Sequence, residues 1–263
     1  PEEPTGKNPP DGAILDYQLN SNVQQVMLEI WDDGGQKIAS FLSDDAKEEL
    51  DSTLMRHPTY WMRPQKSLST ATGHHRFIWN LRHPAPKGVQ RGFAIAAVQY
   101  DTPSGPNGPF VAPGNYTVKL IADGEVSERM LTVRLDPRVT LSEADAALQS
   151  DLSLLVYEAY HDLQTIRDNL DQLLDTTKKG KKKKEALLKF RGDGLPSGGD
   201  MLYGSIRETP LSEESIVGLQ EKLLFLLEVL QSADAKPTSQ TKDAVEILVN
   251  RSKDLIIKWN GIK

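Results

Sequence analysis

The sequence contains no cysteine. This absence excludes disulfide-stapled scaffolds, thiolate zinc sites and cysteine nucleophiles. Aromatic residues make up only 6% of the chain, and no apolar run approaches the roughly 20 residues of a membrane span. An excess of basic charge is also missing, because 31 Lys and Arg stand against 37 Asp and Glu for a net charge of −6. We therefore expect neither a membrane span nor a nucleic-acid-binding domain.

The length and the apolar content set the scale of the fold. With 263 residues and 38% hydrophobic residues, the chain can build two modest cores. Residues 1–11 are rich in Pro and lack the basic and apolar regions of a signal peptide. We expect these eleven residues to be a linker within a longer protein.

Apolar residues alternate with polar ones from Gly12 to about Leu135, which is typical of half-buried strands. Turn signals separate the strands, with Gly34-Gly35 and Asp123-Gly124 as the clearest. The pattern predicts an immunoglobulin-like β-sandwich over residues 12–139. Two long insertions, 44–72 and 83–114, interrupt it. We expect helical turns near 46–55 in the first and a further strand near 93–98 in the second.

The period becomes helical in residues 140–263. The first stripe runs through Leu148, Leu152, Leu155, Ala159, Leu163, Ile166, Leu170 and Leu173. Ser142 and Asp145 form its start signal. Further helices are predicted to open at Ser212 and Thr238, behind Pro210 and Pro237. The fold class is therefore α+β, all-β then all-α, with a three-helix antiparallel bundle after the sandwich.

A long polar loop is expected at about 178–210, between the first two helices. It opens with six lysines within residues 178–184. They suit an acidic partner, but we interpret them as a solvated corner at the end of the first helix, where the helix dipole favours cations.

Several spaced motifs point to a known family. The segments NPPDGAILDYQL, VMLEIWDDGGQKI, GHHRFIWNLRHPAP, APGNYTVKLIADG and LTVRLDPRV resemble the region after the β-propeller in secreted bacterial BNR-repeat, sortilin-like proteins labelled glycosyl hydrolases. The GHHRFIWNLR and APGNYTVKL pair is also similar to the immunoglobulin-like domain of flagellar hook-capping proteins, and the C-terminal segments fit the helices of the same BNR-repeat proteins. This resemblance implies an extracellular or periplasmic accessory domain. Any glycosidase chemistry would belong to the propeller, whose Ser-x-Asp-x-Gly-x-x-Trp turns do not occur in this sequence.

The polar candidates for chemistry have structural interpretations. His74 and His75 are adjacent on a predicted strand and point to opposite faces, and His83 lies far along it, so the three diverge rather than converge on a metal. The acid pairs 32–33 and 44–45 have the residue type that turns favour. No Gly-x-Ser-x-Gly elbow or phosphate-binding loop occurs. We expect no catalytic residue, metal or cofactor in this chain.

The insertion aromatics leave two hypotheses open. In the first, the chain is a non-catalytic structural and interaction module that packs against or tethers a β-propeller, of the same parent protein or of another. In the second, it is a carbohydrate-binding accessory module with a stacking platform of Tyr60, Trp61 and Tyr100. The alternative role of these rings is to plug the ends of the sandwich or face the propeller, whereas periodicity alone places Trp79 and Tyr116 in the core.

Overall fold

The computed structural model describes residues 9–46, 58–65, 67–93, 102, 104–176, 180–196 and 214–262. Its strands precede its four α-helices, which confirms the α+β class. The chain forms two compact units, and each is assembled from separate stretches of sequence. The sheet unit comprises Pro1–Glu49, Pro64–His83 and Gly114–Arg134. The helical unit comprises Leu50–Arg63, Pro84–Pro113 and Leu135–Lys263.

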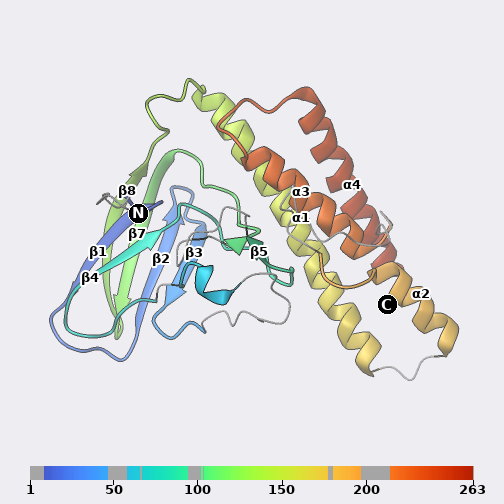
Figure 1. The fold of residues 1–263 in the computed structure, drawn as a ribbon, viewed down its shortest axis with the longest axis horizontal. Helices are drawn as coiled ribbons and strands as arrows, with labels where there is room; N and C mark the ends of the chain where they lie inside the picture. Colours follow the sequence, from blue (N-terminus) through green and yellow to red (C-terminus); the bar gives the residue numbers. More distant parts are fainter. Residues whose placement is uncertain are drawn as a thin grey trace. The chain divides into compact units, whose positions relative to one another are not determined.

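The sheet unit contains two antiparallel sheets (Figure 1). The smaller sheet pairs β1 (Ala13–Leu19) with β4 (Gly73–Trp79), so that the first residue of β1 faces the last of β4. The larger sheet has the order β3-β2-β7-β8. Its strands are β2 (Val26–Asp32), β3 (Lys37–Leu42), β7 (Gly114–Ala122) and β8 (Glu125–Val133). β3 and β8 therefore form the two edges of the larger sheet.

The core of the sheet unit lies where the inner faces of the two sheets meet. Alternate residues of β2 point inward, and Val26, Leu28 and Ile30 are at most 2% exposed. Two ring contacts join the sheets: Phe41 with Phe77 at 4.8 Å between ring centroids, and Trp79 with Tyr116 at 5.9 Å. These contacts confirm that Trp79 and Tyr116 are core residues.

The chain closes tightly around the end of β4. The Trp79 indole N–H donates to the Arg82 carbonyl at 3.1 Å. Gly12 has φ +135°, and a Cβ there would lie 2.2 Å from the Trp79 carbonyl oxygen, so only glycine fits this position. Leu81 was expected to share a strand face with Trp79, which is wrong. β4 ends at Trp79, and Leu81 has φ +57°, which breaks the alternation.

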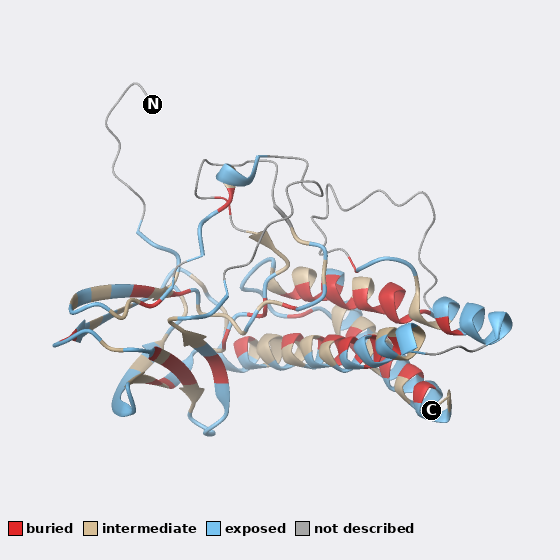
Figure 2. Cartoon of the chain, turned by 90° about the horizontal axis from the view of Figure 1, so that it is seen from below, coloured by how far each residue is buried: buried red, intermediate tan, exposed pale blue. Residues whose placement is uncertain are grey.

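The helical unit is built mainly from α1 (Glu143–Thr176), α3 (Ile216–Gln231) and α4 (Ser239–Ile262), which contact one another (Figure 1). It also holds the short strands β5 (Gly92–Phe93) and β6 (Ser104–Gly105) and the 3-10 turn η1 (Thr59–Trp61). Buried positions recur along the helices (Figure 2) and form one apolar cluster. None of the described helices is long and apolar enough to cross a membrane.

The expected helical stripes are largely confirmed. All five apolar positions expected on α3 are buried: Ile216, Leu219, Leu223, Leu226 and Leu230. On α1 one position is wrong, because Leu155 is 46% exposed while its neighbour Val156 is fully buried. Side-chain capping confirms two helix starts, since Ser142 accepts from the Asp145 amide and Thr238 from the Thr241 amide.

α3 begins later than expected. Its N-cap is Ser215, whose hydroxyl accepts from the Gly218 amide at 3.1 Å, so the helix opens at Ile216 rather than at Ser212. Residue 212 itself is outside the described ranges.

A fourth helix corrects the expected three-helix bundle. α2 (Lys181–Arg191) forms inside the segment expected to be a polar loop. Lysine is a good helix former, and one buried side chain, Leu187, anchors the helix to the apolar cluster. Arg191 at its end forms a bidentate ion pair with Asp171 of α1.

α2 corrects one part of our interpretation of the lysine run, because Lys181–Lys184 are exposed as expected of a solvated corner, but the expected effect of the helix dipole is wrong. Lys181–Lys184 form the first turn of a helix rather than the end of one, and this turn contains no acidic residue. At that end the dipole disfavours cations. The helix dipole therefore does not explain these four lysines.

Candidate functional site

The proposed aromatic platform centres on η1 of the helical unit. The Trp61 amide donates to the Pro58 carbonyl at 3.1 Å, which closes the turn. Two backbone hydrogen bonds join the turn to buried Thr102. The Arg63 amide donates to the Thr102 carbonyl at 2.8 Å, and the Thr102 amide donates to the Trp61 carbonyl at 3.2 Å. This backbone anchoring holds the two aromatic residues of η1 in place.

The turn places the rings of Tyr60 and Trp61 edge to face. Tyr60 is 49% exposed and Trp61 is half-buried. Their ring centroids lie 6.3 Å apart with an interplanar angle of 87°. Two perpendicular rings cannot stack on the same face of one sugar, so only one of them can act as a flat platform. The third expected member, Tyr100, lies outside the described residues.

The three histidines of GHHRFIWNLRHPAP make separate local contacts. His74 is exposed on β4, whereas the His75 Nε2 atom forms a hydrogen bond with the Ala71 carbonyl at 2.6 Å. Burial lowers the pKa of His83, although the nearby Asp32 carboxylate opposes the shift. In the described part of the chain, no group of three His, Asp or Glu side chains is arranged to hold a metal ion.

Three of the four carboxylates in the candidate acid pairs bind local chain segments. Asp32 accepts from the Gln36 amide at 2.7 Å, and Asp45 accepts from the Leu42 amide at 2.7 Å, each across a turn. Asp44 accepts from the Gln25 side-chain amide at 3.1 Å. These three carboxylates therefore stabilise turns and strand ends, as the composition of turns predicts.

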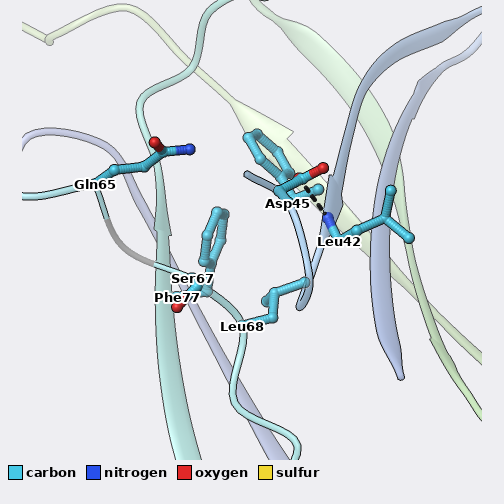
Figure 3. A pocket seen from close by; sticks show the side chains of 7 residues that line it. Leu42, Asp45, Gln65, Ser67, Leu68 and Phe77 are labelled. Atoms are coloured by element: carbon cyan, nitrogen blue, oxygen red, sulfur yellow. Dashed lines mark hydrogen bonds between the residues drawn. The ribbon is translucent and has the colours of Figure 1, made fainter. Parts of the chain in front are cut away.

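A small cavity opens beside Asp45 in the sheet unit (Figure 3). It is lined by Phe41, Leu42, Asp45, Gln65, Ser67, Leu68 and Phe77. Its volume of about 20 Å³ is close to what one water molecule requires. It can take a solvent molecule rather than a sugar or a cofactor.

Sequence reasoning missed a charged cluster around Trp31 on the outer face of the larger sheet. The Trp31 indole N–H donates to Glu29 at 3.1 Å, and Lys37 forms an ion pair with the same carboxylate at 3.0 Å. The ammonium groups of Lys37 and Lys119 lie 5.7 and 5.3 Å from the Trp31 ring centroid. Both cations are within cation–π distance of the ring, so these side chains contact one another across the outer face.

Sequence reasoning also missed how α1 binds residues 84–91, which we call the strap. Each contact joins a side chain of α1 to a backbone carbonyl of the strap. Tyr157 donates to Pro84 and Tyr160 donates to Lys87, both at 2.8 Å. Arg167 donates to Gly88 at 2.5 Å. The signal in the sequence is the helical spacing of Tyr157, Tyr160, Gln164 and Arg167, which places four long polar side chains on one side of α1.

Arg167 is the centre of this polar network. It is 2% exposed and also donates to Gln220 of α3 at 3.0 Å and to Gln164 at 2.6 Å. Burial lowers the pKa of its guanidinium, with nearby groups acting in both directions. Gly88 has φ +62°, and a Cβ there would lie 2.2 Å from the Arg167 Nη2 atom. The network thus requires glycine at this point of the strap.

Tyr116, Tyr157 and Tyr160 are expected to ionise near pH 12 rather than near pH 10. Burial raises the pKa of each to about 12. Between these pH values the unfolded chain loses protons that the folded chain retains, so the free energy of unfolding falls as pH rises through this range and is unaffected below it. Ultraviolet absorbance of the phenolates measures this titration. Tyr160→Phe should remove one of the ionisations that occur near pH 12. Ionisation of all tyrosines in one step near pH 10 would contradict the prediction.

Comparisons with known proteins add no identification. The chain matches no protein-family model, no curated protein and no solved structure.

Proposed function

We propose that this chain is a non-catalytic structural and interaction module from the C-terminal part of a secreted BNR-repeat, sortilin-like protein, which packs against or tethers a β-propeller. In this proposal the sheet unit is an immunoglobulin-like sandwich, a view supported by its two antiparallel sheets in contact. The helical unit acts as a buttress. The motifs GHHRFIWNLR and APGNYTVKL carry the family resemblance, and they correspond to strands β4 and β7.

One observation carries the non-catalytic part of the proposal. Asp32, Asp44 and Asp45, three of the four paired carboxylates that the sequence offers as glycosidase acids, bind backbone amides or a neighbouring side chain of their own unit. A general acid or nucleophile must instead face a bound sugar, with its partner carboxyl about 5 to 9 Å away. Their present bonds are those of turn residues.

Hydrolysis assays test this part directly. On a panel of chromogenic glycosides, the chain should match the rate of buffer alone, as should Asp32→Asn and Asp45→Asn variants. Turnover that is lost in either variant, while the variant stays folded, would make that aspartate catalytic and overturn the proposal.

A binding experiment tests the interaction part. If the same reading frame encodes a β-propeller, that propeller, produced as a separate polypeptide, should form a complex with this chain that sedimentation and calorimetry detect. Most specific protein complexes have dissociation constants below about 100 µM. Failure to bind at a protein concentration of about 100 µM would therefore exclude the propeller as the partner.

The exposure of Tyr60 favours a second candidate function, carbohydrate binding through Tyr60, Trp61 and Tyr100. If a glycan binds here, Tyr60→Ala should weaken binding at least about fivefold, because a stacked aromatic contributes on the order of 1 kcal/mol or more. Trp61→Ala tests the other ring. Trp31→Ala is the matched control, since Trp31 is also half-buried but lies on a sheet of the other unit. A glycan array without any binding would reject this candidate.

A further inference from the structure

The edge of the larger sheet at β8 plays no part in the function proposed above. β8 pairs with β7 in an unbroken register from Glu125 to Val133, and it contains neither Pro nor Gly. Residues 125–130 are exposed on both faces of the strand. In the described part of the chain, no strand pairs with its other side. A long, regular and exposed edge strand is a template for pairing with another strand.

The other edge of the same sheet is different. β3 has six residues, and its pairing with β2 contains an irregularity between Ile30 and Trp31. Bulges of this kind twist an edge and hinder further pairing. β8 has no such irregularity, so it is the edge suited to extension of the sheet.

The β7–β8 turn shows which backbone groups face this open edge. Asp123 and Gly124 both have positive φ, 46° and 91°, as in a type I′ hairpin turn. The turn residues Ala122 and Glu125 then form the first hydrogen-bonded pair, and alternate residues after Glu125 direct their N–H and C=O groups outward. The outward groups belong to Val126, Glu128 and Met130. The Arg129 guanidinium donates to the Glu128 carbonyl at 2.7 Å, as expected for a carbonyl without a strand partner.

Symmetry restricts how two copies of β8 can pair. A two-fold axis between antiparallel strands stands perpendicular to the sheet, so residues on the same face must lie opposite each other. A pairing centred on Glu128 or on Arg129 places like charges directly opposite, which is destabilising. A pairing centred on Ser127 places Glu125 of each copy opposite Arg129 of the other. A pairing centred on Met130 opposes no charges within β8.

The Ser127-centred pairing fits both the charges and the backbone. Val126 and Glu128 direct their backbone groups outward and would exchange hydrogen bonds with the second copy. Glu125 and Arg129 occupy the positions without these bonds, where opposed side chains approach most closely. Two ion pairs would therefore form, one on each side of the axis.

We propose that β8 pairs antiparallel with β8 of a second copy of this chain, centred on Ser127, with Glu125 of each copy against Arg129 of the other. The paired segment is short, so the interface is smaller than that of a stable complex, and dissociation constants of about 10 to 1,000 µM are expected.

Sedimentation velocity across this concentration range tests the proposal with charge variants. In the R129E dimer, both contacts between Glu125 of one copy and residue 129 of the other join two glutamates instead of a glutamate and an arginine. This change should weaken the dimer at least about tenfold. The double variant E125R/R129E exchanges the charges and should restore the dissociation constant to within about threefold. R134E is the matched control, because it makes the same charge change just beyond β8 and should have little effect.

A backbone variant tests the pairing independently of charge. V126P removes an N–H that faces the open edge and leaves the bonds to β7 intact, so it should abolish the dimer while circular dichroism stays unchanged. If V126P does not fold, the charge variants still test whether β8 pairs with β8 of a second copy. A wild-type chain that is monomeric throughout the range would overturn the proposal. So would equal weakening by R129E and R134E, or a double variant as weak as R129E alone.

Discussion

Replacing Trp79 by alanine is expected to lower the free energy of unfolding by about 3–5 kcal/mol, the range for truncation of a large buried aromatic residue. Trp79 is fully buried between the two sheets. The substitution removes its edge-to-face contact with Tyr116 and leaves the Arg82 carbonyl without the indole donor. Urea unfolding followed by circular dichroism measures the change.

Trp31→Ala is the control for this prediction, because Trp31 lies half-buried on the outer face of the same unit. It should cost about 0.5–2 kcal/mol, since it removes cation–π contacts and little core packing. The loss of free energy of unfolding in Trp79→Phe should lie between the losses in Trp79→Ala and Trp31→Ala. If Trp79→Ala costs no more than Trp31→Ala, the contact between the sheets does not hold the unit together.

Arg167→Leu is expected to cost about 3–5 kcal/mol, as removal of one member of a buried charged network does. The substitution leaves the Gly88 carbonyl and the side chains of Gln164 and Gln220 without their shared donor. Unsatisfied buried polar groups account for most of this cost. Arg134→Leu changes an exposed arginine in the same way and should stay within about 0.5 kcal/mol of wild type.

A double-mutant cycle with Gly88→Ala identifies the cause. Gly88→Ala alone should destabilise the chain, because its Cβ meets the Arg167 guanidinium and its φ is positive. Part of that cost should vanish in the Arg167→Leu background, where the guanidinium is absent. Strictly additive effects would show that Gly88 and Arg167 do not act together.

The elements that depend on local patterns were predictable. Alternation placed Trp79 and Tyr116 in the core, and both are buried. The Ser142–Asp145 signal marked the start of α1. The core prediction succeeded because burial of one face imposes a period of two on a strand. The helix start was predictable because the first turn of a helix leaves amides that a serine side chain can accept from.

Features that depend on distant contacts were not predictable. Nothing near Gly88 in the sequence indicates that its carbonyl binds Arg167, 79 residues further along. α2 was expected to be a loop because its lysines suggested a solvated segment, yet buried Leu187 and the ion pair between Arg191 and Asp171 anchor it. A single exposed turn likewise decides the angle between Tyr60 and Trp61, which residue types alone do not encode.

The path of the chain between the units has an energetic consequence. The segment Pro84–Pro113 leaves the sheet unit after β4, belongs to the helical unit, and returns to the sheet unit at β7. While α1 holds the strap, residues 84–91 of this segment have already lost much of their conformational freedom. If the helices melt, the strap is released, and the connection between β4 and β7 closes a longer free loop at a greater entropic cost. Melting of the helical unit should therefore lower the melting temperature of the sheet unit, so that calorimetry records partly merged transitions rather than two independent ones.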